Sequence, residues 1–240
     1  MRSTLALALF LLLAGCAGCR ENRDRAPTTS PTIGSSPMRP LGPAVMMRHE
    51  VLSISVREAI VRGDLGSARR NAVELGAVTV GGSPELLERS KDLSAAADAI
   101  AQAPDLAAAA RATGAMVRTC GDCHARLTGP TRLEVAPPPP LEGGRRVRMR
   151  RHNWAMNRLW DGLVANSEEP WRAGAEVLAD AKLPPGDLVP RANRAPEVEQ
   201  IAASVSVLGQ RALAASDTNV RSEIYGELLT TCADCHGRVR

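Results

Sequence analysis

The chain has 240 residues, of which 44% are hydrophobic and only 2% aromatic, and its formal net charge is +4 at pH 7. Once a targeting segment and linkers are set aside, this length suits two small domains of about 100 residues each. Abundant alanine, few strand-favouring aromatic residues, and proline and glycine in clusters predict an all-α protein whose helical bundles are joined by flexible segments. The small charge, with no aromatic residues interleaved in a basic patch, argues against a nucleic-acid-binding protein.

Residues 1–15 have the pattern of a signal peptide. A charged start is followed by an apolar run from Leu5 to Leu13, which is too short to span a bilayer as a mature helix. The run ends at Leu13-Ala14-Gly15-Cys16, which resembles the bacterial lipobox and implies that Cys16 is acylated. Ala17 favours sorting to the outer membrane. We therefore expect a lipoprotein of the bacterial periplasm, anchored through acylated Cys16; ordinary cleavage nearby is the alternative, and either route exports the chain.

Residues 16–43 predict a lipidated flexible tether, because proline, serine, threonine and arginine leave little to bury. The first helical domain is then expected at 44–128, where Ser83-Pro84-Glu85 has the form of a helix start, with serine as N-cap and proline in the first turn. Residues 129–144, "GPTRLEVAPPPPLEGG", predict a semi-stiff extended linker. A second helical domain follows at 145–240. The expected helices cover approximately 44–62, 65–77, 84–103, 105–128, 145–166, 169–181, 194–215 and 217–237.

The two predicted domains are copies of one repeat. "CGDCH" at 120–124 and "CADCH" at 232–236 lie 112 residues apart, and no gap is needed over the stretch that leads to them. In the first helix of each copy the offset is 103 residues, and the difference is assigned to an extra loop at Leu183–Arg191. The matched pairs are Pro84 with Pro196, Gly114 with Gly226, Thr119 with Thr231, Met46 with Met149, and His49 with His152.

Both repeated glycines fall inside a predicted helix, six residues before the first cysteine of each motif. Glycine there costs about 1 kcal/mol relative to alanine. Its repetition suggests that a cofactor or a facing helix approaches closely at Gly114 and Gly226. A bend in the helix is the alternative.

The CxxCH motif has the spacing of a haem-attachment site. On a helix the two cysteines share one face and the histidine lies over the first cysteine, so two thiols can bond the haem vinyl groups while the imidazole ligates iron. Two copies at matched positions of a repeat, in an exported chain, strengthen this interpretation. The alternatives are a zinc site, which needs four cysteine and histidine ligands, and a pair of disulfides.

Four helices with CxxCH near the end of the fourth resemble the class II c-type cytochromes, the cytochrome c′ group. The segments "MMRHE" and "MRRHN" early in each copy strengthen the likeness, which covers both predicted domains but not the tail or linker. It implies two tandem four-helix bundles, each with a covalently attached c-type haem. The implied haem residues are Cys120, Cys123 and His124 for the first bundle and Cys232, Cys235 and His236 for the second. Two domains in one lipoprotein depart from the usual single-domain form.

His49 and His152 are the candidates for the second axial ligand of each iron. Each belongs to a stripe with helical spacing that is expected to face inward: Val45, His49, Leu52, Val56 and Ala59, and Met149, His152, Met156, Leu159 and Leu163. Met46 and Met149 are the rival ligands, and a five-coordinate iron is the third possibility. Histidine in place of methionine would lower the reduction potential.

The first hypothesis is a dihaem cytochrome that carries single electrons in the periplasm between periplasmic or membrane redox proteins. No acid–base pair marks a catalytic site, so an enzyme is not expected. Two alternatives stay open: a gas-binding or sensing protein for NO or CO with an open iron, and a small haem peroxidase in which an unligated distal histidine serves as acid and base. A cluster of arginines at 145–151 is either a solvated group or a docking surface for an acidic partner.

Overall fold

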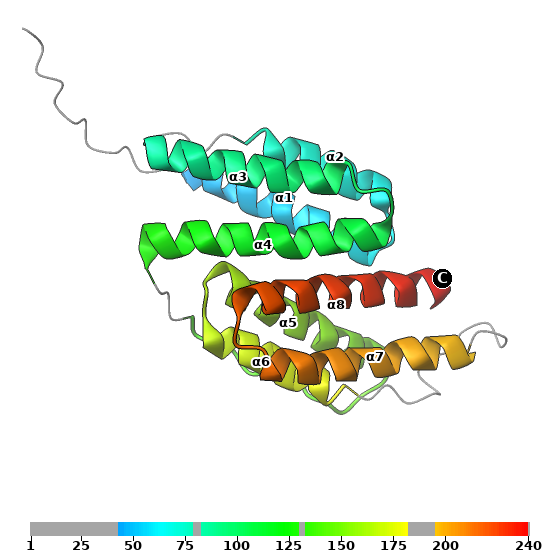
Figure 1. Cartoon of the computed structure of the whole chain (residues 1–240). Coiled ribbons are helices and arrows are strands. Elements are labelled where there is room, and N and C mark those ends of the chain that lie inside the picture. Colours follow the sequence, from blue (N-terminus) through cyan, green and yellow to red (C-terminus); the bar gives the residue numbers. More distant parts are fainter. Residues whose placement is uncertain (1–42, 79–82, 130–132, 182–194, 240) are drawn as a thin grey trace, which may run out of the picture. The chain divides into compact units, whose positions relative to one another are not determined.

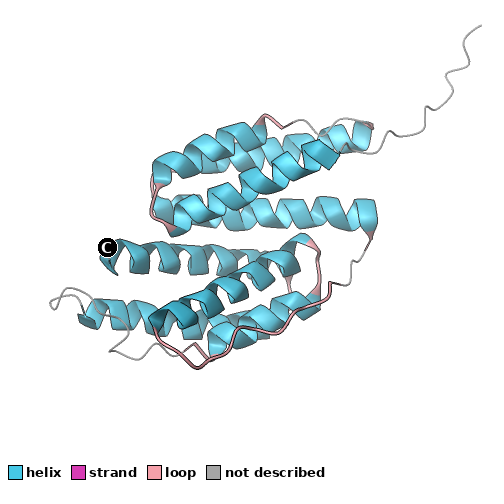
Figure 2. Cartoon of the chain, turned by 180° about the vertical axis from the view of Figure 1, so that it is seen from behind, coloured by secondary structure: helices cyan, strands magenta, loops and turns pink. Residues whose placement is uncertain are grey.

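The computed structural model describes residues 43–78, 83–129, 133–181 and 195–239, which belong to one compact unit (Figure 1). The expected all-α class is confirmed for these residues: they form eight helices and no strand (Figure 2). The signal peptide, Cys16, Cys19, the tether and the extra loop fall outside them. The helices are α1 Pro43–Val61, α2 Leu65–Gly76, α3 Pro84–Ala101, α4 Leu106–Thr128, α5 Arg145–Val164, α6 Glu168–Ala179, α7 Ala195–Ala214 and α8 Thr218–Val239.

Local signals in the sequence explain where the helices begin. Ser83 caps α3 by accepting a hydrogen bond from the main-chain N–H of Leu86 at 3.2 Å, as its place before Pro84 predicted. Asp105 caps α4 in the same way, accepting from the N–H of Ala108 at 2.7 Å. None of the described helices is both long enough and apolar enough to cross a bilayer.

α1 and α5 end in the same structure. In α1 the N–H of Asp64 bonds the carbonyl of Ala59 at 2.9 Å, and the N–H of Gly63 bonds that of Ile60 at 2.8 Å. This is a Schellman ending, in which Gly63 takes the left-handed conformation at φ 75°. α5 repeats it 103 residues later, with Asn166 at φ 47° in the position of Gly63. The two helix ends therefore match even though "RGD" and "ANS" share no residue.

The helices form two sets in chain order. α1 to α4 pack successively and α1 also touches α4; α5 to α8 repeat the pattern. We call α1–α4 the first half and α5–α8 the second half. The halves meet along α4 and α8, which run antiparallel in Figure 1 and pack as extensively as any helix pair among the described residues. One hydrophobic core includes residues of both halves, while the division into two domains at the linker stays a prediction.

The two repeated glycines lie where α4 and α8 cross. A Cβ atom on Gly114 would be 2.2 Å from the carbonyl oxygen of Ser222, and one on Gly226 would be 2.9 Å from the Cα atom of Arg111. A facing helix thus makes the close approach expected from the sequence at these glycines. The glycine of each half is thus approached by a helix of the other half.

Aromatic and cationic side chains complete the centre of this interface. The Arg57 guanidinium of α1 lies 5.3 Å from the ring centroid of Trp160 on α5, and Trp160 is 6.1 Å from the ring of Tyr225 on α8. Arg57, Trp160 and Tyr225 are all buried. Trp171 is also buried, and its indole N–H donates to the carbonyl of Ala212 at 2.9 Å. The tryptophans at 160 and 171 therefore pack in the core.

Candidate functional site

The first CxxCH motif lies in the last three turns of α4 and borders an apolar pocket. Cys120, Cys123 and His124 all line this pocket, which has about 450 Å³ of empty space including its open mouth. The remaining lining residues come from α1, α3 and α4: Met46, His49, Arg89, Ser90, Leu93, Thr119 and Leu127. The structure therefore brings the motif and both distal candidates of the first half into one pocket.

His49 reaches this pocket from the second turn of α1 and is only 9% exposed. Burial lowers its pKa, and the nearby charge of His124 lowers it further. Burial also lowers the pKa of His124. Both imidazoles are therefore held in the neutral form, which is the form that binds a metal through a ring nitrogen. The inward stripe of α1 is confirmed by the burial of Leu52, Val56 and Ala59 beyond His49.

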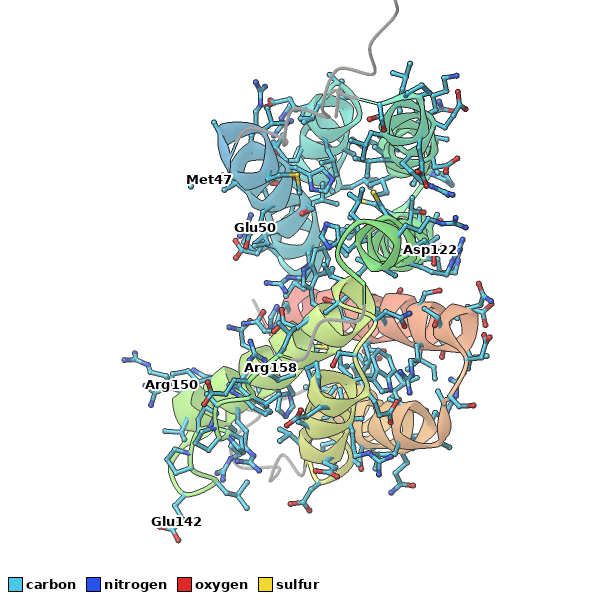
Figure 3. All side chains as sticks on the ribbon, turned by 90° about the vertical axis from the view of Figure 1, so that its left-hand side faces the viewer. Met47, Glu50, Asp122, Glu142, Arg150 and Arg158 are labelled. Atoms are coloured by element: carbon cyan, nitrogen blue, oxygen red, sulfur yellow. The ribbon has the colours of Figure 1, made fainter. Side chains whose placement is uncertain are left out.

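The thiols of the first motif lie in apolar surroundings. Burial raises the pKa of Cys120 to about 12, and that of Cys123 is also raised by burial. Such thiols are poor nucleophiles for disulfide exchange. Between them, the Asp122 side chain points away from α1 into solvent and pairs with Arg118 at 2.9 Å (Figure 3). The two cysteines thus turn toward the pocket while the residue between them stays outside.

Arg89 is a pocket residue that the sequence analysis did not single out. Its Nη1 atom lies 3.2 Å from an Asp92 carboxylate oxygen, yet its Nε atom is buried without a hydrogen-bond partner. The guanidinium is close enough to Cys123 to work against the rise in that thiol's pKa. A buried N–H donor facing an apolar pocket fits a ligand that carries a carboxylate, such as a haem propionate. The repeat gives no signal for it, because the aligned residue in the second half is Ile201.

The second motif occupies the matching position near the end of α8. Burial raises the pKa of Cys232 to about 12 and also raises that of Cys235, which packs on Val198 and Ala202 of α7. His152 of α5 lies close to His236: burial lowers its pKa to about 4, and the charges of Arg151 and His236 act in the same direction. Each half therefore brings its first-helix histidine next to its motif histidine.

Both motif histidines are bonded to the other half of the molecule. His236 of α8 donates its Nδ1–H to the main-chain carbonyl of Val61, the last residue of α1, at 2.9 Å. The His124 ring is hydrogen-bonded to the carbonyl of Val164, the last residue of α5. A carbonyl only accepts, so the ring nitrogen is the donor in each case. Nothing in the side-chain pattern predicts these bonds, although an offset of 103 aligns Val61 with Val164.

The two motifs lie at opposite ends of the α4–α8 pair (Figure 1). Gly114 stands level with Ser222 at the crossing of these antiparallel helices. His124 and His236 lie about 10 and about 14 residues beyond that crossing, in opposite directions. At a rise of 1.5 Å per residue they are separated by about 36 Å along the helix axes. Two separate sites result, rather than one shared centre.

The zinc and disulfide alternatives find little support in this arrangement. No group of three or more histidine, cysteine, aspartate or glutamate side chains that could hold a metal ion occurs in the described part of the chain. The four motif cysteines are free thiols. The residues do fit a haem. Each motif has two thiols whose pKa values are raised by burial and a histidine with one ring nitrogen bonded to a main-chain carbonyl. In the first half the histidine and both thiols line an apolar pocket.

Comparison of the chain with family models, with curated proteins and with solved structures finds no match.

Proposed function

We propose that this chain is a dihaem c-type cytochrome, built as two tandem four-helix bundles of the class II kind, that carries single electrons. The observation that carries the proposal is the convergence of Cys120, Cys123, His124 and His49 on one apolar pocket. In the second half, His152 lies within electrostatic range of His236, which supports it as well. With the lipobox at Cys16, the proposed location is the periplasmic side of a bacterial membrane, where the chain would exchange electrons with periplasmic or membrane proteins.

In this proposal each bound haem supplies a one-electron couple between ferric and ferrous iron. Cys120 and Cys123, or Cys232 and Cys235, hold the group covalently. His124 or His236 would ligate the iron through one ring nitrogen while the N–H of its other ring nitrogen is held by a carbonyl. Arg89 offers its buried N–H to a propionate of the first haem.

His49 and His152 are the proposed distal ligands. In each half the same histidine lies within electrostatic range of the motif histidine, and in the first half His49 lines the pocket together with its rival Met46. Neutral imidazole is a strong iron ligand, and two such ligands close the iron to exogenous gases. Closed coordination on both irons favours an electron carrier over a gas sensor or a peroxidase.

The first experiment measures haem content and the response to CO. The chain is produced in a bacterial host that attaches c-type haem, and the visible spectrum is recorded oxidised, reduced and reduced with CO. We expect two haems per chain, and one in a C232S/C235S variant. A reduced spectrum unchanged by CO supports electron transfer; a CO-induced shift favours the gas-binding alternative. A chain without a Soret band contradicts the proposal.

The second experiment identifies the distal ligands. H49A and H152A should each convert one haem from low spin to high spin and make that haem bind CO. M46A and M149A are the matched controls, one turn away, and should leave the spin state unchanged. The reverse result would make methionine the ligand. Loss of peroxide turnover in H49A or H152A, with no change in spin state, would instead identify an acid–base catalyst.

A further inference from the structure

We propose that each half of the molecule tunes the haem of the other half, through a main-chain carbonyl at the end of α1 or α5 that holds the opposite motif histidine. The carbonyl of Val61, in the first half, serves His236, and the carbonyl of Val164, in the second half, serves His124. This inference rests on the proposed function. It assigns positioning groups to residues that carry no distinctive side chain.

The ends of α1 and α5 explain why these carbonyls are available. The last carbonyls of a helix have no partner within the helix. At both ends the Schellman turn provides donors for the two carbonyls that precede the last one of the helix. In α1 these are the carbonyls of Ala59 and Ile60, which precede that of Val61. No described main-chain N–H bonds the carbonyl of Val61 or of Val164. The histidine of the opposite half therefore takes the one carbonyl that the turn leaves open.

Close packing fixes this arrangement around the first motif. A Cβ atom on Gly121, inside CGDCH, would be 2.2 Å from the carbonyl oxygen of Leu163. Only glycine permits α4 to approach the end of α5 so closely. The second motif has Ala233 at this position, and it is 5% exposed. The first motif is thus pressed against the other half at the residue after its first cysteine.

The carbonyl sets the properties of the histidine in two ways. A ligating histidine that donates its other N–H to a carbonyl is fixed in one tautomer and becomes a more basic ligand. The end of a helix also carries partial negative charge, so α1 and α5 direct the negative ends of their dipoles at these rings. Both effects stabilise ferric over ferrous iron and lower the reduction potential of the haem in the opposite half.

The test places a strained residue at each helix end and examines the haem of the other half. Val in the left-handed conformation is strained, whereas Asn and Gly accept it. G63V should disturb the carbonyl of Val61, and its Cβ would make only ordinary contact, because the nearest atom is a side-chain carbon of Leu106 at 4.0 Å. N166V should disturb the carbonyl of Val164. G63N and N166G exchange the two natural residues and are the matched controls.

Midpoint potentials are measured in full-length chains that retain one motif, using C120S/C123S to isolate the second haem and C232S/C235S to isolate the first. G63V should raise the midpoint potential of the second haem by about 59 mV, which for one electron is a ten-fold change in the ferrous-to-ferric ratio. The potential of the first haem should stay unchanged. N166V should do the reverse. G63N and N166G should change neither. A shift confined to the haem of the mutated half would overturn the inference.

A second measurement does not depend on haem. In the haem-free full-length chain, ¹H–¹⁵N NMR of the histidine rings reports which nitrogen carries the proton. We expect the Nδ1–H tautomer at His124 and His236, and its loss at His236 in G63V. The Nε2–H tautomer at both rings of the unmodified chain would overturn the inference. A chain that shows the Nδ1–H tautomer but attaches no haem would contradict only the proposed function.

Discussion

The first and second candidate sites share their inner parts and differ in their surroundings. Each has two cysteines that are buried or half-buried, a motif histidine bonded to the opposite half and a first-helix histidine within electrostatic range of it. Around the first motif, α3 contributes Arg89 and Ser90; the aligned residues of α7 are Ile201 and Ala202. The two halves thus share the cysteines and histidines that would hold a haem and differ in the residues of α3 and α7 that would surround it.

The approach to the two sites differs as well. α5 opens with Arg145 and Arg146 on the surface, followed by exposed Arg150 two residues before His152. In α1 the residue aligned with Arg150 is Met47, which is 64% exposed and points outward (Figure 3). The start of α5 is therefore more cationic than the aligned part of α1, where exposed Met47 is followed by exposed Arg48. This difference teaches that two similar haems at opposite ends of α4 and α8 would meet different partners.

The largest expected effect is a loss of folding stability at low pH that comes from His152. The pKa of His152 is about 4 in the folded chain against an ordinary 6.5, so protons bind the unfolded chain more tightly. The resulting stability is complete above pH 6.5 and is lost as the pH falls toward 4, by about 3 kcal/mol. Urea unfolding of the haem-free chain at pH 7 and pH 4 should show this loss, and H152Q should remove that much of it.

H49Q is the control for this experiment. The pKa of His49 is also lowered by burial, so H49Q should relieve a loss of the same sign. If H152Q and the unmodified chain lose equal stability between pH 7 and pH 4, His152 is not held neutral in the folded chain.

The next effect tests the crossing of α4 and α8. G114A places a Cβ atom against the main-chain carbonyl of Ser222, and we expect a loss of about 3 kcal/mol from overpacking, offset by about 1 kcal/mol of helix propensity. G226A has more room, so its net cost should be about 1 kcal/mol or less. Thermal unfolding of the two variants measures the difference. Equal stabilities would mean that the glycines do not sit at a close crossing.

Much of the fold could be predicted because its signals are local. Period-3.6 stripes, the caps at Ser83 and Asp105 and the Pro/Gly stretch at 129–144 place the helices within a few residues of their observed ends. The repeat also brought Gly114 and Gly226 forward as sites of close approach. CxxCH needs only its own spacing on one helix, so the motif residues were found without tertiary information.

The partners of those residues could not be predicted in the same way. The carbonyls of Val61 and Val164 are main-chain atoms, which the side-chain pattern does not mark. They matter only because α8 reaches α1 and α4 reaches α5 across the interface between the halves. Arg89 has no repeat signal, and its significance comes from a buried Nε atom beside the pocket. Such features depend on packing between distant segments.

A smaller effect tests the cationic approach to the second site. R145E/R146E/R150E should slow the oxidation of the reduced second haem by ferricyanide about ten-fold at low ionic strength, because the anion is no longer attracted. The rates should converge at 1 M salt, where charges are screened within about 3 Å. Stopped-flow absorbance in the single-haem chains measures this. The first haem, about 36 Å away along the helices, is the internal control; equal slowing of both would contradict two separate docking surfaces.

The smallest effect concerns Arg89, a charged residue of the first pocket that is aligned with Ile201 in the second half. R89I gives the first half the residue of the second and removes a cation that favours the more negative, ferrous state. Because the Arg89 side chain is 29% exposed and already paired with Asp92, water and the carboxylate screen it. We expect a fall of about 1 kcal/mol in the preference for ferrous iron, roughly 40 mV, at the first haem alone. A potential unchanged in R89I would place the propionates away from α3, and the difference between the two sites would then lie in their outer approaches.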